Sequence, residues 1–354
     1  MAIQHIEDPS LASASTGDAS AADAVTYVTD KYPGSVVISG SDIRIQAGWS
    51  GSGISMGKDS SAASNFIRMG YAQQGTTYVS FGYNPRNSPV VDEILTFRHL
   101  GDAVQHVTLQ LLSGGSIRAL RGSGFGTALG TAYNVLRPGT WNHIEVKVTI
   151  SDTVGVVELW VNDIQVLDLT SQDTRNGGAS DNSDTVDFVG AAAIIAGVAG
   201  ETIFSDIVIR DDDFSGPIPT EAIVPDAAGD LTDWTPSAGS NHENVEEIPK
   251  DDDTTYNDTV TANDIDLHNM GSLALVASGI VGMKVDLDVR VTAGSENIRT
   301  KVRSGATTDD GASQPVSNTT TFDTFSEILE TDPDTAAPWT VSGVNAVQIG
   351  YEHL

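Results

Sequence analysis

Apolar and polar residues alternate in short runs along most of the chain, and each run is bounded by Gly, Asn, Asp or Ser. This period of two is typical of β-strands with one buried face, and a helical period of 3.6 is nearly missing. The pattern therefore predicts an all-β protein. The clearest expected strands are Val36–Ser39, Asp42–Gln46, Thr77–Tyr83, Ile94–Arg98, His106–Leu111, Ser116–Leu120, His143–Ile150, Val156–Val161 and Ile164–Leu169, followed by Ile280–Val291, Asn297–Arg303, Glu327–Glu330 and Val344–Gly350.

Turn residues join several of these strands at hairpin distance. The polar segment Ser151–Gly155 separates two strands, and Asn162-Asp163 gives a second turn signal before the next strand. Many short strands at regular spacing favour a β-sandwich or jelly roll over a parallel α/β fold. One short helix is expected near Asp18–Thr29.

Composition divides the chain into three parts. Residues 1–20 are rich in Ala, Ser, Thr and Asp, which predicts a flexible N-terminal arm. Residues 21–214 carry the main set of strands and form the expected jelly-roll domain. The run Ser215-Gly-Pro-Ile-Pro interrupts regular structure, so residues 215–354 are expected to form a smaller, β-rich C-terminal domain.

Two segments carry a family resemblance. The runs Arg137–Ile150 and Gly155–Asn162 resemble the concanavalin A-like, laminin G-like jelly-roll family, in which a turn delivers a tryptophan before a long strand and its hairpin partner. Phe204–Arg210 is similar to the closing strand of such a sandwich, which returns beside the N-terminal strand. The resemblance implies a jelly roll over roughly Ala21 to Asp213.

The C-terminal part resembles the tail domain of a family of tailed-bacteriophage virion proteins, through Asp233–Ser237, Asp251–Tyr256 and Glu330–Gly350. In that family the same jelly roll precedes the same tail domain. The resemblance implies a structural protein made in the host cytoplasm and carried on the virion exterior. It would be associated with the tail or fibres, form a homo-oligomer, contact tail or major capsid proteins, and adhere to a host surface glycan through repeated weak sites. The alternative is a decoration or cement protein on the capsid.

Charge and composition exclude several other classes. The formal net charge is −30, which disfavours direct binding to nucleic acid because the phosphate backbone is also negative. No apolar run is long enough for a membrane span, so no membrane insertion is expected. The first residues lack the basic and apolar parts of a secretory signal. Cysteine is absent, which removes disulfides, zinc-thiolate sites and thiol nucleophiles.

Catalytic patterns are missing from the sequence. A retaining glycosidase needs two close carboxyl groups, and the hydrolytic branch of the resembled family has Glu-x-Asp-x-x-Glu on one strand, a run that this chain lacks. Glu145 and Glu158 are single acids on neighbouring predicted strands, expected to face solvent near Lys147. The glycines of Arg121–Gly126 have neither the strand–turn–helix context of a nucleophile elbow nor that of a dinucleotide site. The chain is therefore expected not to be an enzyme, with a glycan depolymerase as the remaining alternative.

Calcium is the one ligand that the loops suggest, although no cofactor is expected to be required. Concanavalin A-like domains often hold Ca²⁺ at one rim, and hard oxygen ligands in loops suit that ion. No histidine pair shows the spacing of metal ligands. Trp141 and Trp160 are expected in the first core, and Trp234 and Trp339 in the second. The calcium candidates are Asp173 with Asn176, Asp181 with Asp184, and the runs Asp211–Asp213 and Asp251–Asp253.

Overall fold

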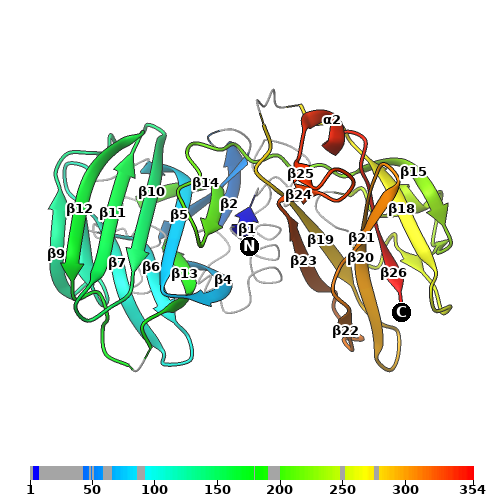
Figure 1. The fold of residues 1–354 in the computed structure, drawn as a ribbon, viewed down its shortest axis with the longest axis horizontal. Coiled ribbons are helices and arrows are strands. Elements are labelled where there is room, and N and C mark those ends of the chain that lie inside the picture. The colour runs from blue at the N-terminus through cyan, green and yellow to red at the C-terminus, as the bar shows by residue number, and fades with distance from the viewer. Residues whose placement is uncertain are drawn as a thin grey trace. The chain divides into compact units, whose positions relative to one another are not determined.

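The chain is nearly all β and forms two compact units, Met1–Thr220 and Glu221–Leu354. Figure 1 shows the strands of both units. The computed structural model describes residues 3–7, 43–47, 49, 52–58, 66–85, 92–178, 180–189, 200–247, 252–274 and 279–354. The sequence places the boundary at residue 215, whereas the structure places it after Thr220. Among the described residues, no helix has the length and apolar character needed to cross a bilayer.

Unit 1 is a jelly-roll sandwich of two antiparallel sheets. The larger sheet has the order β12-β11-β10-β5-β14-β3-β2, with β1 added beside β14, and the smaller sheet has the order β4-β13-β6-β7-β8-β9. The strands are β1 (Ile3–Glu7), β2 (Ile43–Ala47), β3 (Ser52–Lys58), β4 (Phe66–Gln74), β5 (Thr76–Pro85), β6 (Asp92–His99), β7 (Val104–Leu112), β8 (Ser116–Arg121), β9 (Thr127–Ala132), β10 (Asn142–Thr149), β11 (Gly155–Val161), β12 (Ile164–Gln172), β13 (Ser183–Val189) and β14 (Gly200–Arg210).

The core of unit 1 lies between the two sheets. On β10 the apolar residues at alternate positions point inward, and two of them face apolar residues of β5: Val146 lies opposite Val79 and Ile144 opposite Phe81. All four side chains are at most 1% exposed. Because successive side chains of a strand point to opposite faces, the same alternation sends the polar residues of β10 to the other side of the sheet.

The N-terminal strand differs from the expected arm. Residues 3–7 form β1, which pairs with Ile207–Arg210 of β14, as the family resemblance implied for the closing strand. The expected helix at Asp18–Thr29 and the expected strand at Val36–Ser39 lie outside the described residues.

Unit 2 contains one larger antiparallel sheet and three two-stranded ones. The larger sheet has the order β15-β18-β26-β20-β21, with β22 also paired to β20. The smaller pairs are β16-β17, β19-β23 and β24-β25. The elements are β15 (Pro225–Thr232), β16 (Thr235–Pro236), η3 (Asn241–Asn244), β17 (Asn257–Asp258), β18 (Ile265–Met270), β19 (Met283–Val289), β20 (Glu296–Ser304), β21 (Thr307–Asp310), β22 (Gln314–Val316), β23 (Asp323–Leu329), β24 (Thr331–Asp332), β25 (Ala337–Pro338), α2 (Val341–Val344) and β26 (Gln348–His353).

Two small apolar clusters stabilise unit 2. Trp339 is 1% exposed in one of them, and its indole N–H donates to the carbonyl of Leu329 at 3.1 Å. Trp234 packs against the other cluster and meets Tyr351 edge to face, with ring centroids 4.8 Å apart. Both tryptophans therefore serve the packing of this unit, as the sequence suggested.

Candidate functional site

The polar face of β10 is the outer face of the larger sheet of unit 1, meaning the face that points away from the core. His143, Glu145 and Lys147 lie on it at alternate positions. Residues directly opposite each other on paired strands share a face, so three residues of β5 and two of β11 join them there. These are Gly82 opposite His143, Ser80 and Trp160 opposite Glu145, and Tyr78 and Glu158 opposite Lys147.

A two-residue turn brings a further carboxylate to this face. Asn162 and Asp163 connect β11 to β12 at the turn that the sequence indicated, and their φ values of +49° and +64° are those of a type I′ hairpin. The turn is fixed to His143 by two bonds. The Asn162 N–H donates to the His143 carbonyl, and the His143 N–H donates to Asn162 Oδ1, both at 2.9 Å. Asp163 is thereby held next to His143.

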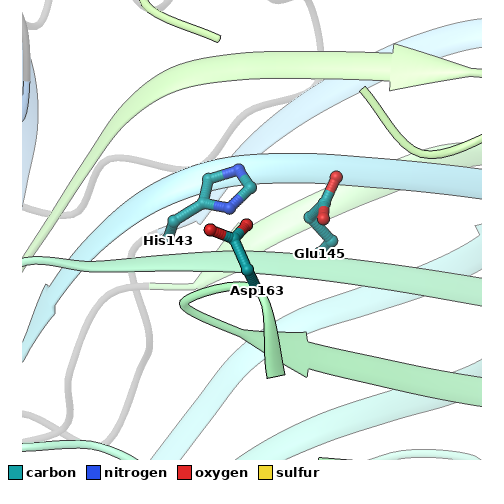
Figure 2. Close-up of side chains that lie close together, drawn as sticks. All are labelled: His143, Glu145 and Asp163. Atoms are coloured by element: carbon teal, nitrogen blue, oxygen red, sulfur yellow. The ribbon is translucent and has the colours of Figure 1, made fainter. Parts of the chain in front are cut away.

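His143, Glu145 and Asp163 form a compact cluster (Figure 2). One ligating atom from each side chain lies within 4.8 Å of the other two. His143 and Glu145 are each 5% exposed, whereas Asp163 is exposed. Burial lowers the pKa of His143, although the charges of Glu145 and Asp163 oppose that effect. The cluster thus combines an imidazole with two carboxylates, a set that can bind a metal ion or move protons.

An aromatic ring covers one side of the cluster. Trp49 stacks on His143, with ring centroids 5.4 Å apart and planes at 25°. Its backbone N–H donates to Ser205 Oγ at 3.0 Å. Gly82 makes this arrangement possible, because a Cβ there would lie 2.6 Å from Ser205 Oγ and 3.0 Å from the Cβ of Trp49.

The crossing segment, Asp211–Thr220, runs from the end of β14 over the same face. The ring of Phe214 packs edge to face on Tyr78 at 5.2 Å and on Trp160 at 6.1 Å. The Gly216 N–H donates to Glu145 Oε1 at 2.7 Å, and the Thr220 N–H donates to Asp206 Oδ1 at 2.8 Å. These contacts explain why the compact unit extends to Thr220.

The crossing segment also corrects two sequence expectations. Glu145 was expected to face solvent, but its Oε1 accepts hydrogen bonds from Ser80 and Gly216 and the side chain is buried. Trp160 was expected in the core, but it lies on the outer face beneath Phe214. Glu158 does pair with Lys147, at 2.8 Å, and this bond raises the pKa of the lysine.

The calcium candidates are dispersed, with Asp251–Asp253 in unit 2 and all the others in unit 1. Within the described ranges, none of them belongs to a group of three close metal-ligating side chains. Asp251 lies outside the described residues, and calcium binding by the others stays a prediction. The contacts of the five principal candidates are Asp173 with Arg121, Asp181 with Arg175 at 2.9 Å, Asp184 with the Leu100 N–H at 3.0 Å, Asp211 with Gln4 at 2.8 Å and Asp213 with the Phe214 N–H at 2.8 Å.

The His143–Glu145–Asp163 cluster was missed at the level of sequence. Its signal was present in part, because His143 and Glu145 stand two apart on a predicted strand and so share one face. The third member, Asp163, comes from the turn between β11 and β12. Only the register of β10 with β11, which pairs Ile144 with Val161, places Asp163 beside His143.

No family model matches the sequence, and no curated protein is similar to it. Solved structures with a similar fold include alginate lyase Aly36B, at 12% identity and a TM-score of 0.40, covering 61% of this chain and 98% of that one. The carbohydrate-binding module CBM66 from Bacillus subtilis has 10% identity and a TM-score of 0.31, covering 44% of this chain and 86% of that one. A GH131 β-glucanase catalytic domain from Podospora anserina has 14% identity and a TM-score of 0.32, covering 54% and 86%.

This comparison contradicts the expectation that the chain is not an enzyme, because the similar structures include alginate lyases and a glucanase catalytic domain. The sequence lacks a paired-carboxylate strand, a serine-nucleophile elbow and a thiol, but the absence of these patterns does not bear on other chemistry. At these identities the similarity concerns the fold and assigns no reaction to this chain.

Proposed function

We propose that unit 1 binds a carbohydrate on the outer face of its larger sheet, around Trp49 and the His143–Glu145–Asp163 cluster. The observation that carries the proposal is an aromatic ring fixed beside polar groups. Trp49 is 37% exposed and held by its stack on His143, while Asp163 next to it is exposed. A fixed aromatic surface receives the apolar face of a sugar ring, and neighbouring carboxylates accept bonds from its hydroxyl groups.

The test is a glycan array followed by calorimetry with the sugar that binds best. Trp49→Ala should weaken binding by about tenfold, because it removes the stacking surface. The matched control is Tyr133→Ala, since Tyr133 is 76% exposed and follows β9 of the other sheet. Absence of glycan binding by the full chain, or equal affinity in Trp49→Ala, would overturn the proposal.

Cleavage of the bound carbohydrate is the second candidate function. The observation that favours it is the set of proton-transferring groups on the same face, an imidazole and two carboxylates within 4.8 Å. Release of new chain ends from the sugar found on the array would support it, and His143→Gln should abolish that release. A bound sugar that stays intact over long incubation would reject this candidate while leaving binding in place.

For the biological setting, we propose the exterior of a tailed-phage particle, at the tail or its fibres, where repeated copies would give avidity. The support is the sequence resemblance over Glu330–Gly350. Labelled antibody on intact particles should decorate tails in low copy number. Label over the whole head, in hundreds of copies, would favour the capsid-decoration alternative.

A further inference from the structure

The arrangement of potential metal ligands on β10 suggests a function in addition to carbohydrate binding. His143 and Glu145 project from one strand face, and Asp163 projects from a turn fixed to the backbone of His143. Their ligating atoms come from two rigid elements and lie within 4.8 Å of one another. A single ion placed between them would reach all three without rearrangement of the backbone.

The negative charge of the cluster is not balanced within the described part of the chain. No ion pair joins Glu145 or Asp163 to a described cation, and the cations nearest in register are used elsewhere. Lys147 pairs with Glu158, and Arg210 pairs with Asp212. Glu145 is 5% exposed, and burying a carboxylate without an opposite charge costs free energy. A bound cation would remove that cost.

A second, independent observation comes from the imidazole. His143 is 5% exposed, and its Nδ1 atom has no hydrogen-bond partner among the described residues. Figure 2 shows a ring nitrogen of His143 pointing toward the carboxylate of Asp163, with Glu145 beside the two. Buried polar atoms are nearly always satisfied, so an orphaned ring nitrogen that faces the Asp163 carboxylate leaves a position that a ligand can fill.

We propose that His143, Glu145 and Asp163 bind a divalent transition-metal cation, Mn²⁺ or Zn²⁺. One imidazole and two carboxylates suit these ions, whereas Ca²⁺ prefers six to eight oxygen ligands. Glu145 Oε1 also accepts bonds from Ser80 and Gly216, so these two residues orient the carboxylate, as outer-shell partners of metal ligands do. The exposed position of Asp163 leaves one side of the ion open to water or to a ligand.

The experiment is a titration of the metal-free full chain with Mn²⁺, followed by electron paramagnetic resonance, in which the free ion gives the measured signal. We expect one Mn²⁺ per chain, displaced by Zn²⁺ and not by equal Ca²⁺. Asp163→Asn and Glu145→Gln should each weaken binding by about tenfold or more. Asparagine tolerates the positive φ at position 163, so that variant keeps the turn.

Glu158→Gln is the matched control, because it removes the same charge from the same sheet face outside the cluster, and it should bind Mn²⁺ as the parent chain does. No Mn²⁺ or Zn²⁺ binding by the parent chain, or equal loss in all three variants, would overturn the proposal. Unfolding curves confirm that each variant is folded. The titration contains no sugar and the array contains no added metal, so the cation site and the carbohydrate surface fail separately.

Discussion

Both units bury a histidine and a carboxylate two residues apart on one strand face. In unit 1 the pair is His143 and Glu145 on β10, and in unit 2 it is Asp266 and His268 on β18. All four side chains are at most 5% exposed. The two pairs are alike in residue type, spacing and burial, so their different surroundings decide what each can do.

The unit 2 carboxylate is saturated by neighbouring donors. Asp266 Oδ1 accepts from the Trp234 N–H at 3.0 Å, and Oδ2 accepts from Asn241 Nδ2 at 2.5 Å and from the Tyr351 hydroxyl at 3.4 Å. Each donor comes from a different part of the unit. Asp266 therefore fastens the segment around Trp234 and the strand β26 to the sheet, which is a structural role.

The unit 1 carboxylate has a different environment. Both of its hydrogen bonds end on Oε1, and the turn at Asp163 adds a second acid instead of a donor. The comparison teaches that burial of a His–carboxylate pair does not identify a functional site. What separates the two is whether donors or further acceptors surround the acid.

The largest expected effect is on the pH dependence of unit 2. Burial lowers the pKa of His268 from 6.5 to about 4. Between these pH values the histidine is protonated in the unfolded chain and neutral in the folded unit. The contribution of neutral His268 to the stability of unit 2 is therefore fully present above pH 6.5. It is lost as the pH falls toward 4, by about 3 kcal/mol in total. Hydrogen exchange of the β18 and β26 amides at several pH values measures this loss.

His268→Gln is the reference for that measurement, because it removes the titration. The pKa of Asp266 is raised by burial, which contributes with the opposite sign as the pH falls, but it does so in both proteins. The difference between parent and variant therefore isolates His268. If stability depended on pH equally in the parent and in His268→Gln between pH 6.5 and 4, His268 would be protonated in the folded unit.

A smaller effect is expected from Asp266→Asn. Both oxygens of Asp266 accept from donors, so an amide group in its place must point two hydrogens at Trp234 or Asn241. Losing one acceptor in a buried site costs about 2 kcal/mol. Urea denaturation read out by exchange in β18 should show this loss, whereas unchanged protection would mean that water satisfies the site.

The smallest effect is expected from Glu145→Gln in metal-free buffer. Because both hydrogen bonds end on Oε1, the glutamine oxygen can keep them while the amide replaces Oε2. Removing a buried charge without a described ion pair should leave the stability of unit 1 unchanged or raise it by up to about 1 kcal/mol. Exchange in β10 measures this, and a loss as large as that for Asp266→Asn would assign Glu145 a structural role instead.

Much of the fold was predictable because strand alternation is a local property. The expected strand His143–Ile150 is β10 within one residue at each end, and the Asn162-Asp163 turn is present. The packing of residues 211–220 was not predictable in the same way. Ser215-Gly-Pro-Ile-Pro does break regular structure, but its docking depends on a bond from Gly216 to a residue 71 positions earlier.

The candidate site was predictable only in part for the same reason. The spacing of His143 and Glu145 is visible in the sequence, whereas the burial of Glu145 depends on the distant Gly216 and the place of Asp163 depends on strand register. In the fold Asp181 pairs with Arg175, six positions earlier, whereas Asp163 joins His143 across twenty positions. Closeness in sequence therefore identifies two members of the site, His143 and Glu145, but not the third.

Because Trp49 stacks on His143, its intrinsic fluorescence reports on the cluster. The emission of an indole responds to its immediate surroundings, and for Trp49 these include the stacked imidazole. A cation or sugar arriving at the cluster alters the ring or the water around Trp49, and both change the colour and yield of its fluorescence. The chain has five tryptophans, so a Trp49→Phe variant, subtracted from the parent, isolates the signal without any attached dye.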